Sequence, residues 1–392
     1  MKNLASKAAA LSTRLSEIRR DLHRHPELSF QEHRTADIVA GILEESGMEV
    51  RRCVAKTGVV GILRGSADGS CVALRADMDA LPIEEKTGAE YASVNPGVMH
   101  ACGHDVHTTC VLGAALLLAE NSDDMAGTAV FIFQPAEETN KGAKTMMAEG
   151  ILDDPKVDAI FGLHTAPAIR AGKAGIKAGP LMAAVDTMKI TITGEGGHGA
   201  VPHRTRDAIV AAASVIQNLQ TVVSRKVSPF DQAVVSLGTI HGGKANNVIA
   251  DRVELTGTVR TYDPRTRERM PRLLENIIGH TCSALDTEGV VDYFFDLPAL
   301  VNDAKCAEIG RKAALEALGP DSVVEPVPSG GGEDFAIYLQ QVPGAFFFLG
   351  VSPTDEPSRE WHHPEFDVDE TCLSAGAALL AQTAWDFLHK TP

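Results

Sequence analysis

Residues 129–138 read Ala-Val-Phe-Ile-Phe-Gln-Pro-Ala-Glu-Glu, an uninterrupted apolar run that ends in polar residues. Uninterrupted runs, unlike alternating ones, are typical of strands covered on both faces, as in a mostly parallel sheet between layers of helices. Comparable runs recur at residues 59–63, 71–74, 159–163 and 345–349. We therefore predict an α/β fold whose larger domain is a mostly parallel sheet flanked by helices.

Helical segments are predicted between these runs, at residues 106–118 and 142–149. Nearer the amino end, Ser29 and Glu32 form a capping-box pattern, and Gly47 supplies a stop signal. The apolar residues at helical spacing between these signals are Ile38, Val39, Ile42 and Leu43. We therefore predict a further helix between the capping box and the glycine.

The middle of the chain has a different pattern, because apolar and polar residues alternate there. Alternation indicates strands with one buried and one wet face, which are typical of an antiparallel sheet. Strands are expected at residues 188–193, 233–240, 253–259 and 290–295, with helices at 208–223 and 265–285. This strand-helix-strand-strand-helix-strand order predicts a ferredoxin-like α+β domain. We place it at about residues 182–296, inserted into the larger α/β domain.

Length, composition and charge narrow the class of protein. A chain of 392 residues exceeds one compact core, and 44% hydrophobic and 22% charged residues are ordinary for a globular enzyme. The net charge of −16 repels phosphate backbones, so we expect no nucleic-acid partner. Because no apolar run approaches the roughly 20 residues of a membrane span, we also expect no membrane partner.

The amino terminus and the cysteines indicate a cytoplasmic protein. Lys2 and Lys7 interrupt the apolar residues of the first segment, so we expect no signal peptide. The cysteines are odd in number and show no disulfide framework, which favours a reducing compartment with most of them as small core residues. Cys110 in particular is predicted to be plain core. The seven are Cys53, Cys71, Cys102, Cys110, Cys282, Cys306 and Cys372.

Polar side chains follow the predicted parallel strands at the points where those strands end. Asp77 and Asp79 follow residues 71–74, Glu137 and Glu138 follow residues 129–133, and His164 follows residues 159–163. In open α/β sheets, ligands bind in the crevice outside the carboxyl ends of the strands. The sequence therefore predicts a polar site at this edge of the sheet.

Residues 100–107, His-Ala-Cys-Gly-His-Asp-Val-His, add Cys102, His104 and His107 to the candidates. A thiolate and an imidazole separated by a glycine can bind one cation without strain. A lone cysteine or histidine is more often a packed residue, and adjacent glutamates are more often a solvated turn. Here the glutamates end a buried strand, where unpaired carboxylates are costly and a cation would remove that cost.

The mixed thiolate, imidazole and carboxylate set suits Zn²⁺, with Mn²⁺, Co²⁺ or Ni²⁺ as alternatives. Two such metals give a hydrolase a hydroxide at neutral pH and a clamp for a developing oxyanion. Of Glu137 and Glu138, one can bind metal while its neighbour acts as the general base.

The sequence resembles a known family, the aminoacylase/carboxypeptidase group of dinuclear metallopeptidases. Within that group it resembles the hippurate-hydrolase-like amidohydrolases. The matching segments span almost the whole chain. They are His25-Pro-Glu-Leu-Ser, Arg75-Ala-Asp-Met-Asp-Ala-Leu-Pro, His100-Ala-Cys-Gly-His-Asp, Phe133-Gln-Pro-Ala-Glu-Glu, Gly162-Leu-His-Thr, Gly196-Gly-His-Gly, Asn246-Asn-Val-Ile and His362-His-Pro-Glu-Phe-Asp.

The resemblance implies two divalent metal ions per chain, with Glu137 as the general base. The final ligand falls on His362 rather than His363, because the family ligand precedes a variable residue and then proline. Asp77 lies where related carboxypeptidases have a metal-binding histidine, so it is not counted as a ligand. Asp79 is expected to orient a ligand. The implied ligands are Cys102, His104, Glu138, His164 and His362.

The resemblance also assigns roles to the domains. Residues 182–296 become a lid and dimerisation domain, and residues 1–181 and 297–392 become the catalytic, metal-binding domain. A homodimer, or a tetramer built from dimers, is implied. In the lid, His198 is expected to polarise the substrate carbonyl across the dimer, whereas the substrate carboxylate is expected to be held by Asn247 and Arg260.

Two departures from the family pattern concern the substrate pocket. Members usually read Met-Gly-Ser/Ala-Glu-Asp-Phe near the end, whereas this chain has Gly330-Gly331-Gly332 before Glu-Asp-Phe. Trp361 stands where an aliphatic residue is expected. Both leave the ligand set intact and bear on acyl specificity.

The favoured hypothesis is metal-dependent hydrolysis of the amide bond of small N-acyl amino acids, which releases a carboxylic acid and a free amino acid. An alternative is a dipeptidase or another two-metal amide hydrolase of the same fold. A non-catalytic dimeric binding protein is a third hypothesis, and Glu137 argues against it because a binding protein has no need of a base.

Overall fold

The structure is a computed structural model that describes residues 4–389, and these divide into two compact units. The first unit comprises the described residues up to Leu181, Val301–Val327, and those from Asp334 onward. The second comprises Met182–Leu300 and Pro328–Glu333. The second unit therefore extends past the predicted end of the inserted domain at 296, and it includes residues 328–333, which were expected in the larger domain. The short segment joins the second unit because the Ala183 N–H donates to the carbonyls of Ser329 and Gly331, both at 3.1 Å.

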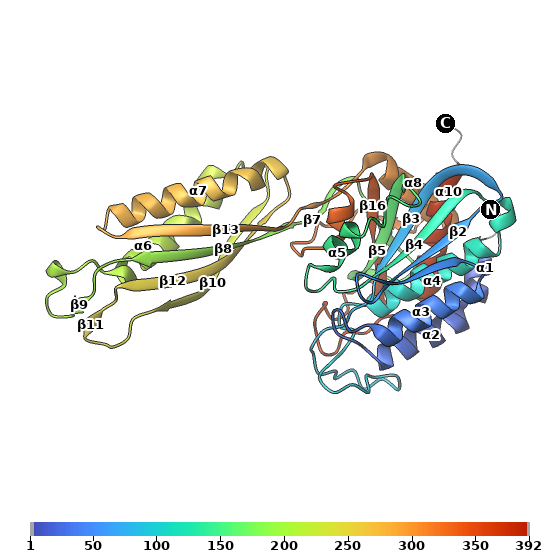
Figure 1. The fold of residues 1–392 in the computed structure, drawn as a ribbon, viewed down its shortest axis with the longest axis horizontal. Coiled ribbons are helices and arrows are strands. Elements are labelled where there is room, and N and C mark those ends of the chain that lie inside the picture. Colours follow the sequence, from blue (N-terminus) through green and yellow to red (C-terminus); the bar gives the residue numbers. More distant parts are fainter. Residues whose placement is uncertain (1–3, 390–392) are drawn as a thin grey trace. The chain divides into compact units, whose positions relative to one another are not determined.

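The first unit contains an eight-stranded sheet in the order β1-β2-β4-β3-β5-β16-β6-β15 (Figure 1). Its central strands β4, β3, β5 and β16 are parallel, whereas β1 and β2 form an antiparallel edge. The predicted mostly parallel sheet is thus confirmed. The strands are β1 Glu49–Val54, β2 Gly58–Arg64, β3 Ala67–Asp77, β4 Ala126–Gln134, β5 Ala159–Arg170, β6 Ala174–Gly175, β15 Val323–Val324 and β16 Gly344–Ser352.

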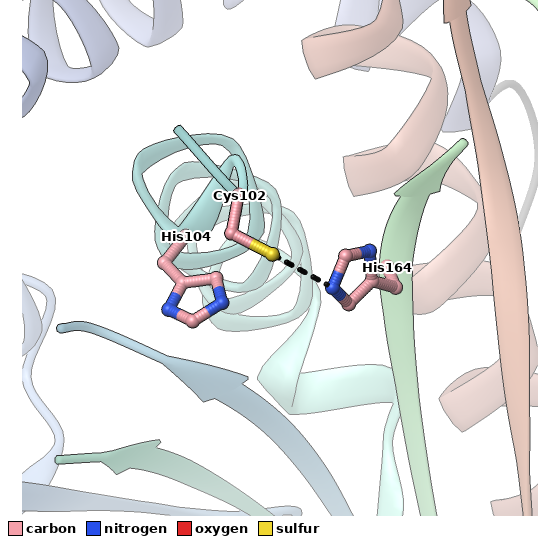
Figure 2. Close-up of side chains that lie close together, drawn as sticks. All are labelled: Cys102, His104 and His164. Atoms are coloured by element: carbon pink, nitrogen blue, oxygen red, sulfur yellow. Dashed lines mark hydrogen bonds between the residues drawn. The ribbon is translucent and has the colours of Figure 1, made fainter. Parts of the chain in front are cut away.

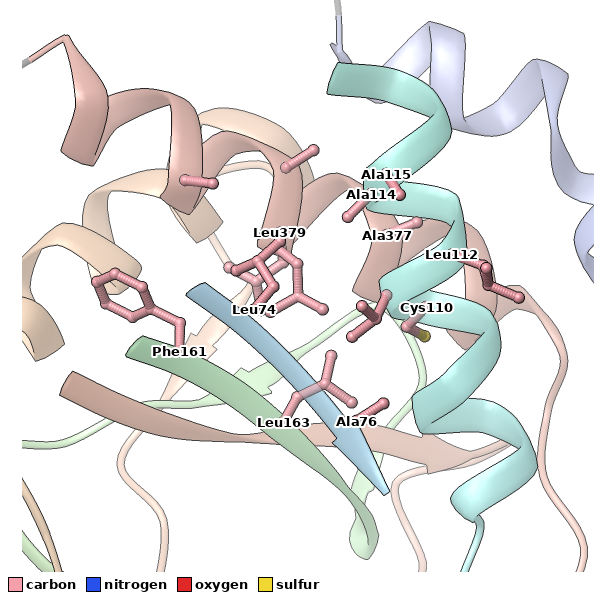
Figure 3. Close-up of a cluster of buried hydrophobic side chains, with 14 of the residues drawn as sticks. Leu74, Ala76, Cys110, Leu112, Ala114, Ala115, Phe161, Leu163, Ala377 and Leu379 are labelled. Carbon is pink, nitrogen blue, oxygen red and sulfur yellow. The ribbon is translucent and has the colours of Figure 1, made fainter. Parts of the chain in front are cut away.

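Two helices of this unit, α4 (His104–Ala119) and α10 (Thr371–Leu388), are apolar around almost their whole circumference. Such helices are stable only when buried on all sides. They pack against each other over the sheet, and Figure 3 shows side chains of both helices in one buried cluster with Leu74 and Leu163 from the strands. Cys110 is fully buried in this core, as expected. The other helices are α1 Leu4–Ala10, α2 Ser12–Arg24, α3 His33–Glu45, α5 Gly142–Ala148, α8 Ala304–Leu318 and α9 Phe335–Tyr338.

The capping box predicted from Ser29 and Glu32 was wrong. Helix α3 begins at His33, and Glu32 makes no side-chain cap. The Glu32 carboxylate instead accepts the N–H groups of Phe30 and Ala136, at 3.0 and 2.9 Å. The Ser29 hydroxyl donates to Asp79, at 2.7 Å. Both side chains therefore bond to these other groups and do not cap the helix.

The second unit contains a four-stranded antiparallel sheet in the order β10-β12-β8-β13, with helices α6 and α7 on one face (Figure 1). The predicted ferredoxin-like order is confirmed. Asp207 and Asp263 cap the two helices by accepting backbone N–H groups. The elements are β8 Ala184–Thr193, α6 Ala208–Thr221, β10 Ala233–Gly242, β12 Arg252–Thr261, α7 Pro264–Ser283 and β13 Glu288–Leu297.

Small ribbons complete the fold. In the second unit β9 (Gly197–His198) pairs with β11 (Val248–Ile249), and elsewhere β7 (Gly179–Met182) pairs with β14 (Leu300–Asn302). Within residues 4–389, no helix combines the length and the apolar character needed to cross a membrane.

Candidate metal centre

The five proposed ligands come together in the first unit, at the carboxyl ends of the parallel strands. Cys102 and His104 lie at the start of α4, and the Cys102 Sγ is 3.5 Å from the His164 Nε2 on β5 (Figure 2). Glu138 follows β4, and its Oε1 is 3.8 Å from the His104 Nε2. The same oxygen is 3.6 Å from the Nε2 of His362, which follows β16.

These ligand atoms form two groups that share a single thiol. Cys102, His104 and His164 make one group, and Cys102, Glu138 and His362 make the other. Within each group the ligand atoms lie within 4.8 Å of one another. If each group held a cation, both would use the Cys102 thiol.

The chemistry of the donors fits divalent ions. Among residues 4–389, the buried His104 Nε2 and Glu138 Oε1 have no hydrogen-bond partner although they face each other. Such orphaned polar atoms are costly unless a ligand satisfies them. Burial raises the pKa of both the Cys102 thiol and the Glu138 carboxyl, so without a cation their charged forms are unfavourable. A bound cation would reverse that preference.

Gly103 makes the Cys-Gly-His turn possible. Its φ of 84° is in the left-handed region that disfavours side chains. A Cβ at this position would also lie 2.6 Å from the Cγ2 of Thr165 on β5. Glycine therefore allows Cys102 and His104 to flank a tight turn against the strand that carries His164.

Asp79 organises the acidic turn after β4. Its carboxylate accepts the backbone N–H groups of Glu137 and Glu138, at 2.9 and 3.1 Å, and the Ser29 hydroxyl. Its Oδ1 also lies 3.4 Å from the Nδ1 of His104. These contacts support the expected orienting role. With Asp79 beside the Nδ1 of His104, the Nε2 of the same ring lies toward Glu138.

His107 and Asp77 bond to each other. The His107 Nδ1 lies 2.6 Å from Asp77, and its Nε2 accepts the Thr165 N–H at 2.9 Å. Both ring nitrogens are thus engaged, which removes His107 from the ligand candidates. Burial alone would raise the pKa of Asp77, but His104, His107 and Arg75 outweigh burial and hold that pKa well below its usual range.

Glu137 lies beside the ligand atoms. A carboxylate oxygen of Glu137, a ring nitrogen of His104 and a carboxylate oxygen of Glu138 lie within 4.8 Å of one another, and only 7% of Glu137 is exposed. With cations held by these groups, this buried carboxylate would be placed to exchange a proton with water.

The residues proposed for the lid, His198, Asn247 and Arg260, lie in the second unit. His198 is exposed on β9, and its Nδ1 accepts the Ala200 N–H at 3.0 Å. A neutral ring with that nitrogen as acceptor carries its proton on Nε2, where it can donate to a carbonyl. Asn247 is next to it, since its carbonyl accepts the Gly199 N–H at 2.8 Å.

Arg260 is not brought close to His198 and Asn247 within the same chain. It lies eight residues along β12 from Arg252, which is about 26 Å at the usual rise per residue. The β9–β11 ribbon is beyond the Arg252 end of the sheet, where the Gly194 N–H bonds to the Asp251 carbonyl (Figure 1). The three proposed lid residues thus form two separate groups in one chain.

Sequence reasoning missed two residues that shape the centre. Thr165 is fully buried and contacts Cys102, His107 and His164 through hydrogen bonds. Ser29 holds Asp79. Both stand inside the quoted motifs, but a motif does not reveal which partner each hydroxyl has.

This sheet edge brings two groups of possible cation ligands together with a buried carboxylate, which are the parts needed to activate water against an amide carbonyl. Fold and site together define a metal-dependent amide hydrolase. The chain belongs to Peptidase family M20/M25/M40, whose sequence model matches residues 73–386. The resemblance to dinuclear metallopeptidases is thereby confirmed.

Named relatives cover nearly the whole chain. N-acetyl-L-cysteine deacetylase of Bacillus subtilis (strain 168) is 43% identical over 376 residues, which cover 96% of this chain and 88% of the relative. IAA-amino acid hydrolase ILR1-like 5 of Arabidopsis thaliana is 40% identical, covering 95% and 85%. The crystal structure of the Bacillus subtilis YXEP protein, a dinuclear metal binding peptidase from the M20 family, is 38% identical with a TM-score of 0.88, covering 98% and 100%.

Proposed function

We propose that the protein hydrolyses the amide bond of small N-acyl amino acids and releases a carboxylic acid and a free amino acid. The observation that carries the proposal is the pair of donor groups sharing Cys102, with Glu137 beside them. The substrate class is supported by the relatives, since one is a deacetylase of N-acetyl-L-cysteine and another an IAA-amino acid hydrolase.

In this proposal Cys102, His104, Glu138, His164 and His362 hold two divalent ions. Such ions, when bound, lower the pKa of water and stabilise the oxyanion of the tetrahedral intermediate. Glu137 accepts the proton of the attacking water and delivers it to the leaving nitrogen as the C–N bond breaks. His198 donates its Nε2–H to the carbonyl oxygen as negative charge develops there.

The metal is proposed to be Zn²⁺, with Mn²⁺, Co²⁺ and Ni²⁺ as the alternatives for a mixed donor set. Elemental analysis of the purified protein should find up to two metals per chain. Chelation should abolish hydrolysis, and one of these ions should restore it. Full activity in a rigorously metal-free preparation would contradict the proposal.

A homodimer formed through the second unit is also proposed, either alone or as half of a tetramer. Strand β10 is an edge strand with unpaired backbone groups on one side. Apolar side chains are exposed on it and on α6, including Val234 at 49%, Ile240 at 54% and Val210 at 51%. The separation of Arg260 from His198 adds support, because a site using both needs two chains.

A cytoplasmic location is proposed as well. All seven cysteines are free, including the buried pair Cys110 and Cys372. Free thiols are typical of a reducing compartment.

A substrate screen tests the proposed reaction. N-acetyl, N-benzoyl and long-chain N-acyl amino acids should be compared with dipeptides, each with and without chelator. Hydrolysis of the N-acyl compounds, with dipeptides cleaved at least tenfold more slowly, is the expected result. Preferential cleavage of dipeptides would identify a dipeptidase instead. Metal binding without hydrolysis of either class would favour a binding protein.

A further inference from the structure

Trp361 links the segments that carry two of the proposed ligands. It immediately precedes His362, and its indole Nε1–H donates to the Thr165 carbonyl at 3.1 Å and to the Thr165 hydroxyl at 3.3 Å. Thr165 immediately follows His164. The indole ring also meets the His164 ring nearly edge to face, with centroids 4.9 Å apart and planes at 75°.

The Thr165 peptide is held from several directions. Its N–H donates to His107 at 2.9 Å, and its hydroxyl donates to the Cys102 carbonyl at 3.0 Å. Its carbonyl accepts from Trp361 and also lies 2.9 Å from the His164 Nδ1. The His164 ring that donates through Nδ1 is the tautomer whose Nε2 lone pair faces Cys102. Trp361 therefore anchors the carbonyl that sets the orientation of a ligand.

The hydrogen bond from Trp361 to Thr165 also bears on the backbone of the neighbouring residue, His362. His362 has a φ of 64°, a strained value for a histidine that persists only when neighbours hold it. The His362 N–H bonds to the Ala101 carbonyl at 2.8 Å, and the residue before it is tied to β5 through the indole. An aliphatic residue at 361 would pack against the His164 ring but would donate no hydrogen bond.

We propose that Trp361 is a positioning residue of the metal centre, whose indole N–H fixes the His164 imidazole and couples it to the His362 segment. The inference rests on the proposed ligand roles of His164 and His362. Hydrogen-bond partners of a ligand typically change metal affinity by about 10- to 100-fold when they are removed, and Trp361 acts through one such partner, the Thr165 carbonyl.

The test is a Co²⁺ titration of metal-free protein, followed by the thiolate-to-metal and d–d absorption bands. Trp361→Phe keeps an aromatic ring and removes the N–H, whereas Trp361→Leu removes both. The chain has two tryptophans, and Trp385→Phe is the matched control because Trp385 stacks on His389 instead. We expect Trp361→Phe and Trp361→Leu to weaken Co²⁺ binding at least about tenfold and to shift the bands, with Trp385→Phe unchanged.

The outcomes separate this inference from the proposed function. Wild-type protein that binds Co²⁺ without a thiolate band would overturn the ligand assignment itself. A normal wild-type titration with an identical titration for Trp361→Phe would overturn the positioning role alone, even if Trp361→Leu were impaired. Thermal unfolding of each variant checks that it is folded.

A second measurement needs no substitution at 361. In Trp385→Phe protein labelled with ¹⁵N, the single indole N–H signal belongs to Trp361. We expect slow exchange with solvent and a chemical-shift change when Co²⁺ or diamagnetic Zn²⁺ binds. Rapid exchange, or no response to Zn²⁺, would contradict the inference.

Discussion

Two residues of the metal centre have backbone angles that their side chains disfavour. Ala136, which precedes Glu137, has a φ of 56°, and His362 has a φ of 64°. Such conformations cost on the order of 1–3 kcal/mol and persist when surrounding contacts determine them. At Ala136 the contact is the Glu32 carboxylate, which accepts its N–H at 2.9 Å. The strain therefore lies where side chains must be aimed at the cation groups.

Glu137→Gln tests whether Glu137 is the general base. The substitution keeps the shape and removes proton transfer, so kcat should fall by roughly 10²–10⁴-fold while metal content stays near two per chain. Glu138→Gln is the matched neighbour, and it should lose metal. Retained activity in Glu137→Gln, together with a metal-loaded but inactive Glu138→Gln, would show that the two roles are swapped.

His23 carries a pH-dependent contribution to stability. It lies in a buried network, 2.8 Å from Asp105, 3.3 Å from Glu85 and 3.4 Å from Arg19. Burial lowers the pKa of His23 and Arg19 lowers it further, but the Asp105 and Glu85 carboxylates together outweigh both, so the pKa is raised. A raised folded-state pKa means that the stabilisation is complete below the unfolded value of about 6.5 and is lost as pH rises through the folded value.

The corresponding prediction concerns His23→Gln. The free energy of unfolding, measured in urea, should differ most from wild type below about pH 6.5, and the difference should shrink as pH rises. His25→Gln, at a less buried histidine on the same helix end, supplies the background. A difference that grows with pH would show that the His23 charge destabilises the fold.

The glycine-rich segment 330–332 has open space for a side chain at its first residue but not at its last. A Cβ on Gly330 would meet nothing within 4 Å. A Cβ on Gly332 would lie 2.3 Å from the Cγ2 of Val185 on β8, in the same unit. The family pattern has Ser or Ala at the second of these positions, and here Val185 occupies that space. The departure at 332 is thus a packing feature of the second unit.

Gly330→Ala and Gly332→Ala form a matched pair. Overpacking typically costs 1–3 kcal/mol, so Gly332→Ala should destabilise by about that amount, whereas Gly330→Ala should change stability by less than about 0.5 kcal/mol. Urea unfolding of both variants measures this difference. Equal effects would mean that contact with Val185 does not restrict the side chain at position 332. The double variant Gly332→Ala with Val185→Ala would then regain none of the stability lost in Gly332→Ala.

The positions of the proposed lid residues bear on how many chains contribute to one active site. His198 and Asn247 are at the end of the second unit beyond Arg252, and Arg260 is about 26 Å from Arg252 along β12. One substrate small enough for this reaction cannot span that distance. If all three serve the reaction, one group acts on the chain's own metal centre and the other on the partner's.

Subunit mixing tests this arrangement. Each of Glu137→Gln, His198→Ala and Arg260→Ala should be strongly impaired alone. Mixing Glu137→Gln with His198→Ala should restore up to half of the wild-type activity per mixed dimer, because one site then has both residues. If Arg260 and His198 act on different centres, mixing Glu137→Gln with Arg260→Ala should restore none, because no site of the mixed dimer then has both residues. Failure of the first mixture, with subunit exchange confirmed, would mean that each chain works alone.

The sequence by itself determined the order and type of the main elements and the chemistry of the ligands. Uninterrupted and alternating apolar patterns separated the two sheets, because burial on one or both faces is a property of each strand alone. Residue types at strand ends indicated a metal site, and five ligands assigned by resemblance were found together.

Only the tertiary structure decided which side chains are partners. Nothing local shows that Ser29 bonds to Asp79 rather than capping α3, or that His107 bonds to Asp77 rather than to a metal. The contact between Trp361 and Thr165 joins residues 196 positions apart. Local patterns report how deeply a residue is buried, whereas its partner depends on how distant segments pack, and packing is settled by the whole chain at once.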